Sequence, residues 1–86
     1  MNDLHTLFDR LPLGWSVVVL DGRRYGVTRS LHGDGRSQSV YAEALDGSDV
    51  VSANLYDVGE QGALRPCEMP EEKVIRFLEG LEPEPT

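Results

Sequence analysis

Two Asp-Gly dipeptides, each set between strand-like runs, constrain the fold more than any other feature of the sequence. Asp21-Gly22 follows the apolar, β-branched run over 15–20, and Asp46-Gly47-Ser48 follows an alternating run over 39–45. Asp-Gly suits a tight hairpin because both central residues of a type I′ turn need positive φ. The runs on either side of each dipeptide are therefore expected to pair as neighbouring antiparallel strands.

Other segments complete a series of strands. Residues 23–30 form the expected returning strand of the first hairpin, and 50–56 form that of the second. A short edge strand is expected over 63–65 and ends at Pro66, which has no N–H to donate to a sheet. All connections between these strands are short, which favours a meander.

A helix is expected at each end of the chain. Asn2 or Asp3 can cap the first helix, which Pro12 and Gly14 end, and Pro70 suits the first turn of the second helix. Each helix has one apolar face, formed by Leu4, Leu7, Phe8 and Leu11 in the first and by Val74, Phe77, Leu78 and Leu81 in the second.

These elements predict an α+β fold with two layers. A four- to five-stranded antiparallel meander sheet is flanked in sequence by an N-terminal and a C-terminal helix, both packed on one face. The 86-residue length predicts a single domain, which we place over 1–81. The proline-broken segment 82–86 is expected to be a disordered tail.

The cysteine count and the N-terminal residues indicate a cytoplasmic protein. One cysteine cannot form an intrachain disulfide and is compatible with a reducing compartment. The first residues show no basic and apolar signal pattern. The longest purely apolar run, 17–20, is far shorter than the ~20 residues that span a bilayer, so no membrane contact is expected.

The net charge of −7 argues against binding to a long nucleic acid, but the charge is unevenly distributed. Residues 22–42 hold four arginines against Asp34, whereas 43–86 are strongly acidic. The functional interpretation is a site for a small anion or an acidic partner, formed by Arg23, Arg24, Arg29 and Arg36. The alternative is that these arginines pair with Glu43, Asp46 and Asp49 across the sheet.

The aromatic residues suggest a contact surface. Trp15, Tyr25, Tyr41 and Tyr56 all fall on expected strands, and helices on one face leave the other face of the sheet open. Those that share the open face would form a patch suited to a protein partner or a homodimer. The alternative is that the rings cover a thin core.

Cys67 is the one candidate catalytic residue. It lies just before the second expected helix and two residues from Arg65, and a helix N-terminus and a cation both stabilise a thiolate. Glu68 and Glu71 oppose that effect, and structural packing is the alternative role. Neither His5 nor His32 has metal-ligand spacing, so we predict no metal site and no cofactor.

Several segments resemble a small family of uncharacterised bacterial proteins, some of whose members carry the label peptide methionine sulfoxide reductase. The segments are 22–30, 40–43, 54–56 and 64–70, and the resemblance extends over nearly the whole chain. For this chain the label implies that Cys67 is the thiolate that attacks the sulfoxide.

Three functions therefore stay open. The leading expectation is a small cytoplasmic, non-catalytic binding or protein-interaction module, whose partner is another protein or a second copy. The alternatives are a thiol-dependent reductase acting through Cys67 and a regulator that binds a small anion.

Overall fold

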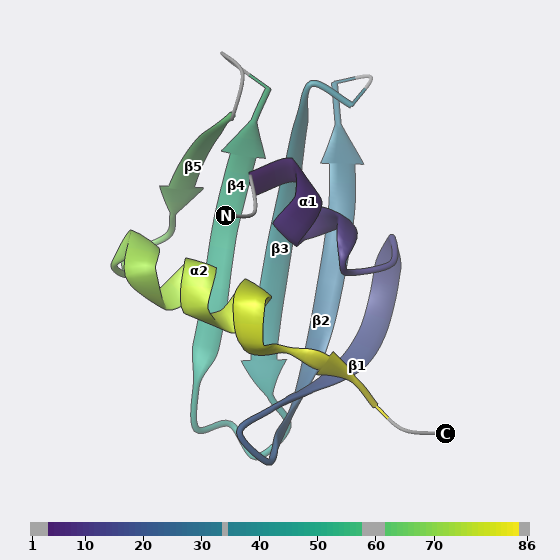
Figure 1. Ribbon diagram of the computed structural model, residues 1–86, viewed down its shortest axis with the longest axis vertical. Helices are drawn as coiled ribbons and strands as arrows, with labels where there is room; N and C mark the ends of the chain where they lie inside the picture. The colour runs from purple at the N-terminus through teal and green to yellow at the C-terminus, as the bar shows by residue number, and fades with distance from the viewer. Residues whose placement is uncertain (1–3, 34, 58–61, 85–86) are drawn as a thin grey trace.

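A six-stranded antiparallel sheet in the order β5-β4-β3-β2-β1-β6 is the frame of the computed structural model, which describes residues 4–33, 35–57 and 62–84. Two helices cover one face of this sheet (Figure 1), which confirms the expected α+β, two-layer meander. In chain order the elements are α1 (Leu4–Asp9), β1 (Gly14–Leu20), β2 (Arg23–His32), β3 (Ser37–Ala44), β4 (Val50–Tyr56), β5 (Ala63–Pro66), α2 (Glu71–Gly80) and β6 (Glu82–Pro83).

Both Asp-Gly hairpins form as expected. Leu20 pairs with Arg23 across the first turn, and the two residues between them have positive φ, 52° for Asp21 and 77° for Gly22. This is the backbone that a two-residue I′ turn requires. The second turn is longer, and the Asp46 carboxylate accepts a 2.9 Å hydrogen bond from the backbone N–H of Ser48. Both turns lie at the same end of the sheet (Figure 1).

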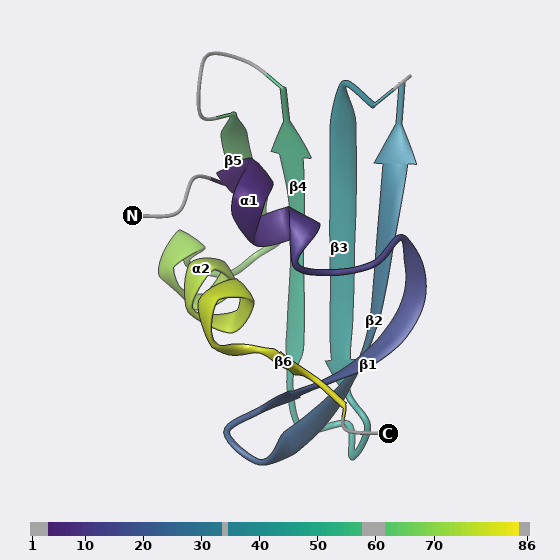
Figure 2. The same ribbon diagram turned by 45° about the vertical axis from the view of Figure 1, so that its right-hand side comes forward.

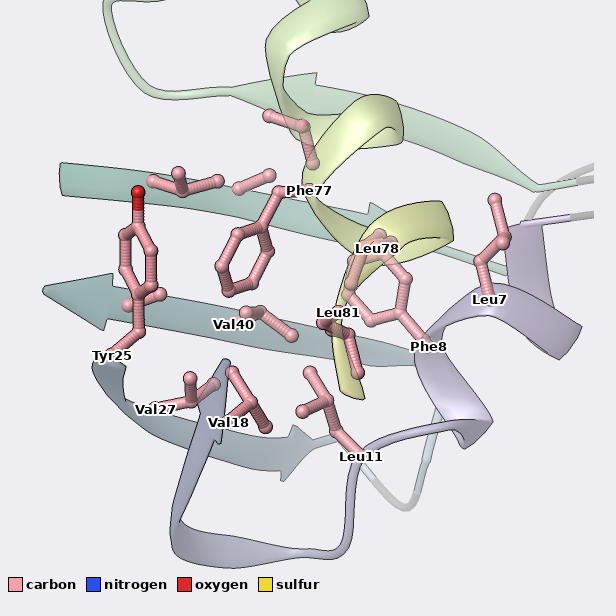
Figure 3. Close-up of a cluster of buried hydrophobic side chains, with 14 of the residues drawn as sticks. Leu7, Phe8, Leu11, Val18, Tyr25, Val27, Val40, Phe77, Leu78 and Leu81 are labelled. Carbon is pink, nitrogen blue, oxygen red and sulfur yellow. The ribbon is translucent and has the colours of Figure 1, made fainter. Parts of the chain in front are cut away.

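The core lies between the two helices and the sheet. The views in Figures 1 and 2 agree that α1 and α2 lie over the same face of the sheet. Their apolar faces are buried as predicted, including Leu7 and Phe8 of α1 and Phe77 and Leu78 of α2 (Figure 3). The strands meet them with Val18, Tyr25, Val27, Val40, Ala42, Val51, Ala53 and Leu55, all buried.

Arg10 links the two helices at their C-terminal ends. Arg10, just after α1, donates hydrogen bonds to the carbonyl oxygens of Leu78 and Glu79, both 2.6 Å, and to that of Leu81 at 2.9 Å. The last carbonyls of a helix have no partner within the helix, so a cation there is favourable. Arg10 thereby joins the end of α1 to the end of α2.

The C-terminal segment differs from the expected tail. Glu82 and Pro83 form β6, which pairs with Val19 and Val18, and the N–H of Glu84 donates to the carbonyl of Val17 at 3.3 Å. Buried Leu81 directs the chain along the edge of β1, where a proline is tolerated because an edge strand has a free side. The capping residues expected at 2–3, residues 85–86 and residues 58–61 between β4 and β5 lie outside the described residues.

The described helices are too short and too polar to cross a membrane.

Candidate functional site

The face of the sheet opposite the helices, which we call the open face, has neither helix over it (Figure 2). Cross-strand partners point to the same side of a sheet, so the pairing register defines its members. They are Trp15, Val17, Val19, Arg24, Gly26, Thr28, Ser30, His32, Ser37, Ser39, Tyr41, Glu43, Val50, Ser52, Asn54, Tyr56, Ala63 and Arg65, with Leu45 just beyond β3.

Two aromatic side chains lie in the central row of the open face. Trp15 of β1 pairs with Thr28, which pairs with Tyr41 of β3, which in turn pairs with Ser52. Trp15 is 67% exposed and Tyr41 is 49% exposed. The predicted aromatic residues Trp15 and Tyr41 therefore come together on one face.

Gly26 makes room for a hollow beside this row. A Cβ atom at Gly26 would lie 3.2 Å from Nε1 of Trp15 and 3.4 Å from Cδ2 of Leu45, so both side chains lie over the bare backbone of the glycine. The hollow has a volume of about 330 Å³, and Tyr41 also lines it. Leu45 is 51% exposed. Leu45 follows Tyr41 by four positions, and side chains an even number of positions apart along a strand point to the same face. This spacing is the sequence signal for its place here.

The rest of the open face is polar and carries little charge. Ser30, Ser39 and Asn54 share one row, and His32 Nε2 lies 3.1 Å from the hydroxyl of Ser39. Arg24 forms an ion pair with Glu84 at 2.7 Å. Across β1–β5, Glu43 and Arg65 are the other charged residues that the register places on this face.

The four arginines of the predicted anion site lie apart. Arg23 lies at the hairpin end on the helix side, and Arg24 belongs to the open face. Arg36 lies in the β2–β3 connection, where its Nε donates to the carbonyl of Gly33 at 3.1 Å. Arg24 pairs with Glu84 and Arg29 with Asp9, and neither acid belongs to the alternative interpretation. Arg23, in contrast, interacts electrostatically with Asp46 and Asp49, two of the acids that the alternative named. The fold therefore does not bring these four residues into one site.

Arg29 has a structural role in this arrangement. Its side chain is 11% exposed and donates to the carbonyl of Leu11 at 2.6 Å, to Oε1 of Gln38 at 2.9 Å and to Asp9 at 3.0 Å. These bonds fasten the end of the α1 segment to β2 and β3. They also satisfy Gln38, the one buried polar residue among the described residues.

Tyr25 points to the helix side, away from Trp15 and Tyr41. Its ring packs against Phe77 with centroids 5.0 Å apart (Figure 3), and its hydroxyl donates to Oδ2 of Asp49 at 2.8 Å. Lys73 of α2 donates to Oδ1 of the same carboxylate at 2.6 Å. The hydrogen bond from Lys73 is the main cause that lowers the pKa of Asp49, and burial raises the pKa of Tyr25.

Cys67 is exposed and lies in the connection between β5 and α2. Its backbone N–H donates to the carbonyl of Ser52 at 3.0 Å, and its side chain lines a shallow hollow together with Asp49, Met69 and Lys73. Neither His5 nor His32 lines that hollow. The exposure leaves the thiol accessible to reagents, and its catalytic role stays a prediction.

Within 4–33, 35–57 and 62–84, no group of three or more His, Cys, Asp or Glu side chains is arranged to hold a metal ion. Comparison with known proteins finds no matching family model, no matching curated protein and no matching solved structure.

Proposed function

We propose that this protein is a non-catalytic binding protein whose open face binds a second copy of the same chain. The observation that carries the proposal is the group of large side chains left uncovered on that face. Trp15 is 67%, Tyr41 49%, Leu45 51% and Tyr56 42% exposed. Trp15, Tyr41 and Leu45 line one hollow, whereas the polar row of Ser39 and Asn54 separates Tyr56 from Tyr41. A contiguous group of exposed apolar and aromatic side chains, such as the first three, is typical of an interaction site rather than of bare surface.

The chemistry of the open face suits protein contact. Tyr and Trp bring large, rigid contact area at low entropic cost, and the surrounding Ser, Thr and Asn side chains supply adaptable hydrogen bonds. Hydroxyl and amide groups both donate and accept, so the same groups can pair with their own counterparts in a second copy. Such self-complementarity is what a twofold symmetric dimer requires.

The charge distribution favours a second copy over an acidic or a basic partner. The chain has a net charge of −7, so two copies repel one another across most of their surfaces. On the open face, Arg24 is paired with Glu84, and Glu43 and Arg65 have opposite signs. Two copies that approach through this nearly neutral face avoid the repulsion, whereas a strongly charged partner gains nothing there.

The size of the face also fits a dimer. Strands about 4.8 Å apart and about seven residues long give the five strands β1–β5 a projected area of roughly 550 Å². Projecting side chains raise the accessible area above that value, toward the ~800 Å² that each partner of a stable pair contributes. Two such sheets would stack about 10 Å apart.

Light scattering combined with size exclusion tests the proposal. We expect twice the 9.5 kDa mass of the chain at micromolar concentration. Leu45→Glu places a charge beside Trp15 and Tyr41 in the hollow of the open face and should yield the monomer. A desolvated, unpaired charge in an interface costs several kcal/mol, which shifts a micromolar dimer to monomer.

Leu31→Glu is the matched control. Leu31 is 47% exposed, but it pairs with Gln38 on the helix side of the sheet, so the same substitution adds the same charge away from the open face. We expect Leu31→Glu to remain dimeric. A monomeric wild-type chain, or loss of the dimer in both variants, would contradict the proposal, and circular dichroism checks that both variants fold.

A further inference from the structure

A second hollow, with a volume of about 560 Å³, lies on the helix side of the sheet. It opens between α2 and the two hairpin turns that lie at the same end of the sheet (Figure 1). This volume is within the range of about 300–1,000 Å³ that is typical of small-molecule sites. Because the hollow is on the helix side, a dimer formed through the open face leaves it accessible.

The hollow has an apolar wall. Leu20 of β1, Val51 of β4 and Phe77 of α2 all line it. Tyr25 lies beside Phe77, with its hydroxyl at the end of the ring that is remote from the strand backbone (Figure 3). A ligand in this hollow can therefore bury an apolar group against aliphatic and aromatic side chains.

Charged groups of both signs surround this wall. Arg23 and Arg76 line the hollow, and so do Asp21 and Glu72. None of these four forms an ion pair with another described residue, whereas Lys73 and Asp49, also in the lining, are paired with each other at 2.6 Å. Within the described residues the hollow thus presents two guanidinium groups and two carboxylates outside any ion pair, and the Arg23 guanidinium is held toward the hollow by a hydrogen bond to the hydroxyl of Tyr25.

We propose that this hollow binds a free amino acid with a large apolar side chain. The carboxylate of the ligand would accept hydrogen bonds from Arg23 and Arg76, because the planar guanidinium matches a carboxylate in two-point contact. Its ammonium group would donate to Asp21 and Glu72. Its side chain would lie on Leu20, Val51 and Phe77. A purely anionic or cationic ligand satisfies only half of these groups.

Amide NMR spectra of the full chain, titrated with L-phenylalanine, test this site. We expect saturable shifts at both hairpin turns and in the first turns of α2, and unchanged signals at Tyr41 on the open face. Two analogues separate the charges, since 3-phenylpropionate lacks the ammonium group and phenethylamine lacks the carboxylate. Each should bind about tenfold more weakly than the zwitterion.

Arg76→Ala should weaken the binding of L-phenylalanine about tenfold, because it removes one charged donor from an exposed position of α2. Arg36→Ala is the matched control. It removes the same charge from the β2–β3 connection, which lies at the opposite end of the sheet from the two Asp-Gly turns (Figure 1), and should leave the affinity unchanged. Absence of saturation by about 10 mM, equal binding of 3-phenylpropionate, or equal losses in the two variants would overturn the proposal.

Discussion

The two faces of one sheet have opposite chemistry although they share every strand. Along β3, Val40 and Ala42 point to the helices and are fully buried, whereas Ser39 and Tyr41 alternate with them on the open face. The difference shows that alternation divides each strand into two sets of side chains, and that the helices then turn one set into the core. The other set is free for contacts.

The polar contacts of the arginines also differ between the two faces of the sheet. On the covered side, Arg10 and Arg29 make short hydrogen bonds to backbone carbonyls, and Arg29 has a mostly buried side chain. On the open side, Arg24 pairs with Glu84 while 55% of its side chain is exposed. Buried polar groups lose much when a partner is removed, and exposed ion pairs contribute little. The covered face should therefore determine stability and the open face should determine association.

The largest expected effect comes from matched aromatic truncations on the two faces. Phe77→Ala removes a fully buried ring that packs on Tyr25, and it should lower the free energy of unfolding by about 3–5 kcal/mol. Tyr41→Ala on the open face should change it by less than about 1 kcal/mol. Each substitution is made separately in the monomeric Leu45→Glu chain, and urea unfolding measures the free energy of unfolding of each variant.

Phe77→Leu, which leaves a smaller cavity, keeps this comparison measurable if Phe77→Ala does not fold. Comparable losses for Tyr41→Ala and Phe77→Leu would show that the open face also supports the fold, and the division of roles between the two faces would be wrong.

A smaller effect is expected from the arginines. Arg29→Ala leaves Gln38 and the carbonyl of Leu11 without their donor, which should cost about 2–3 kcal/mol. Arg24→Ala on the open side should cost less than about 0.5 kcal/mol because its ion pair is exposed to solvent. Thermal denaturation of both variants measures the contrast, and equal losses would contradict it.

Much of this architecture could be predicted because its signals are local. The Asp21-Gly22 turn and the apolar faces of the helices depend on residues a few positions apart. β6 carried no such signal, since Glu82 and Pro83 have poor strand propensity and pair only because α2 ends beside β1.

The candidate site was predictable only in part. Trp15 and Tyr41 could be assigned to strands, but the place of Leu45 beside Trp15 depends on the strand register and on the bare backbone of Gly26. The roles of the arginines depend on contacts far apart in the sequence, such as that from Arg10 to the end of α2, and composition does not encode those.

The ion pair between Asp49 and Lys73, on the covered side of the sheet, should make the stability of the protein depend on pH. Because the pKa of Asp49 is lowered from its ordinary value of 3.8 in the folded protein, its contribution to stability is present above that value and is lost as the pH falls through the folded pKa. Asp49→Asn should lower stability at pH 7 by about 1 kcal/mol or less and flatten the acid decline below pH 4. Parallel acid declines in the wild type and the variant would contradict this assignment.

The smallest expected change in stability comes from adding a single carbon atom to the open face at Gly26. Gly26→Ala adds a Cβ that would lie 3.2 Å from Nε1 of Trp15, so the ring must move outward by a few tenths of an ångström. The Trp15 ring loses contact with the sheet, which destabilises the folded protein, while alanine lowers the conformational entropy of the unfolded chain, which stabilises it. The free energy of unfolding should therefore change by no more than about 0.5 kcal/mol.

The emission of Trp15, the single tryptophan, should nevertheless shift to the red, because its ring becomes more hydrated. The dimer should weaken, because the hollow that Trp15, Tyr41 and Leu45 line is altered at its base. Thr28→Ala, in the same row and without added volume, serves as the control. A large loss of stability with unchanged association would show that Gly26 serves the fold, whereas the opposite result would assign this glycine to the contact surface.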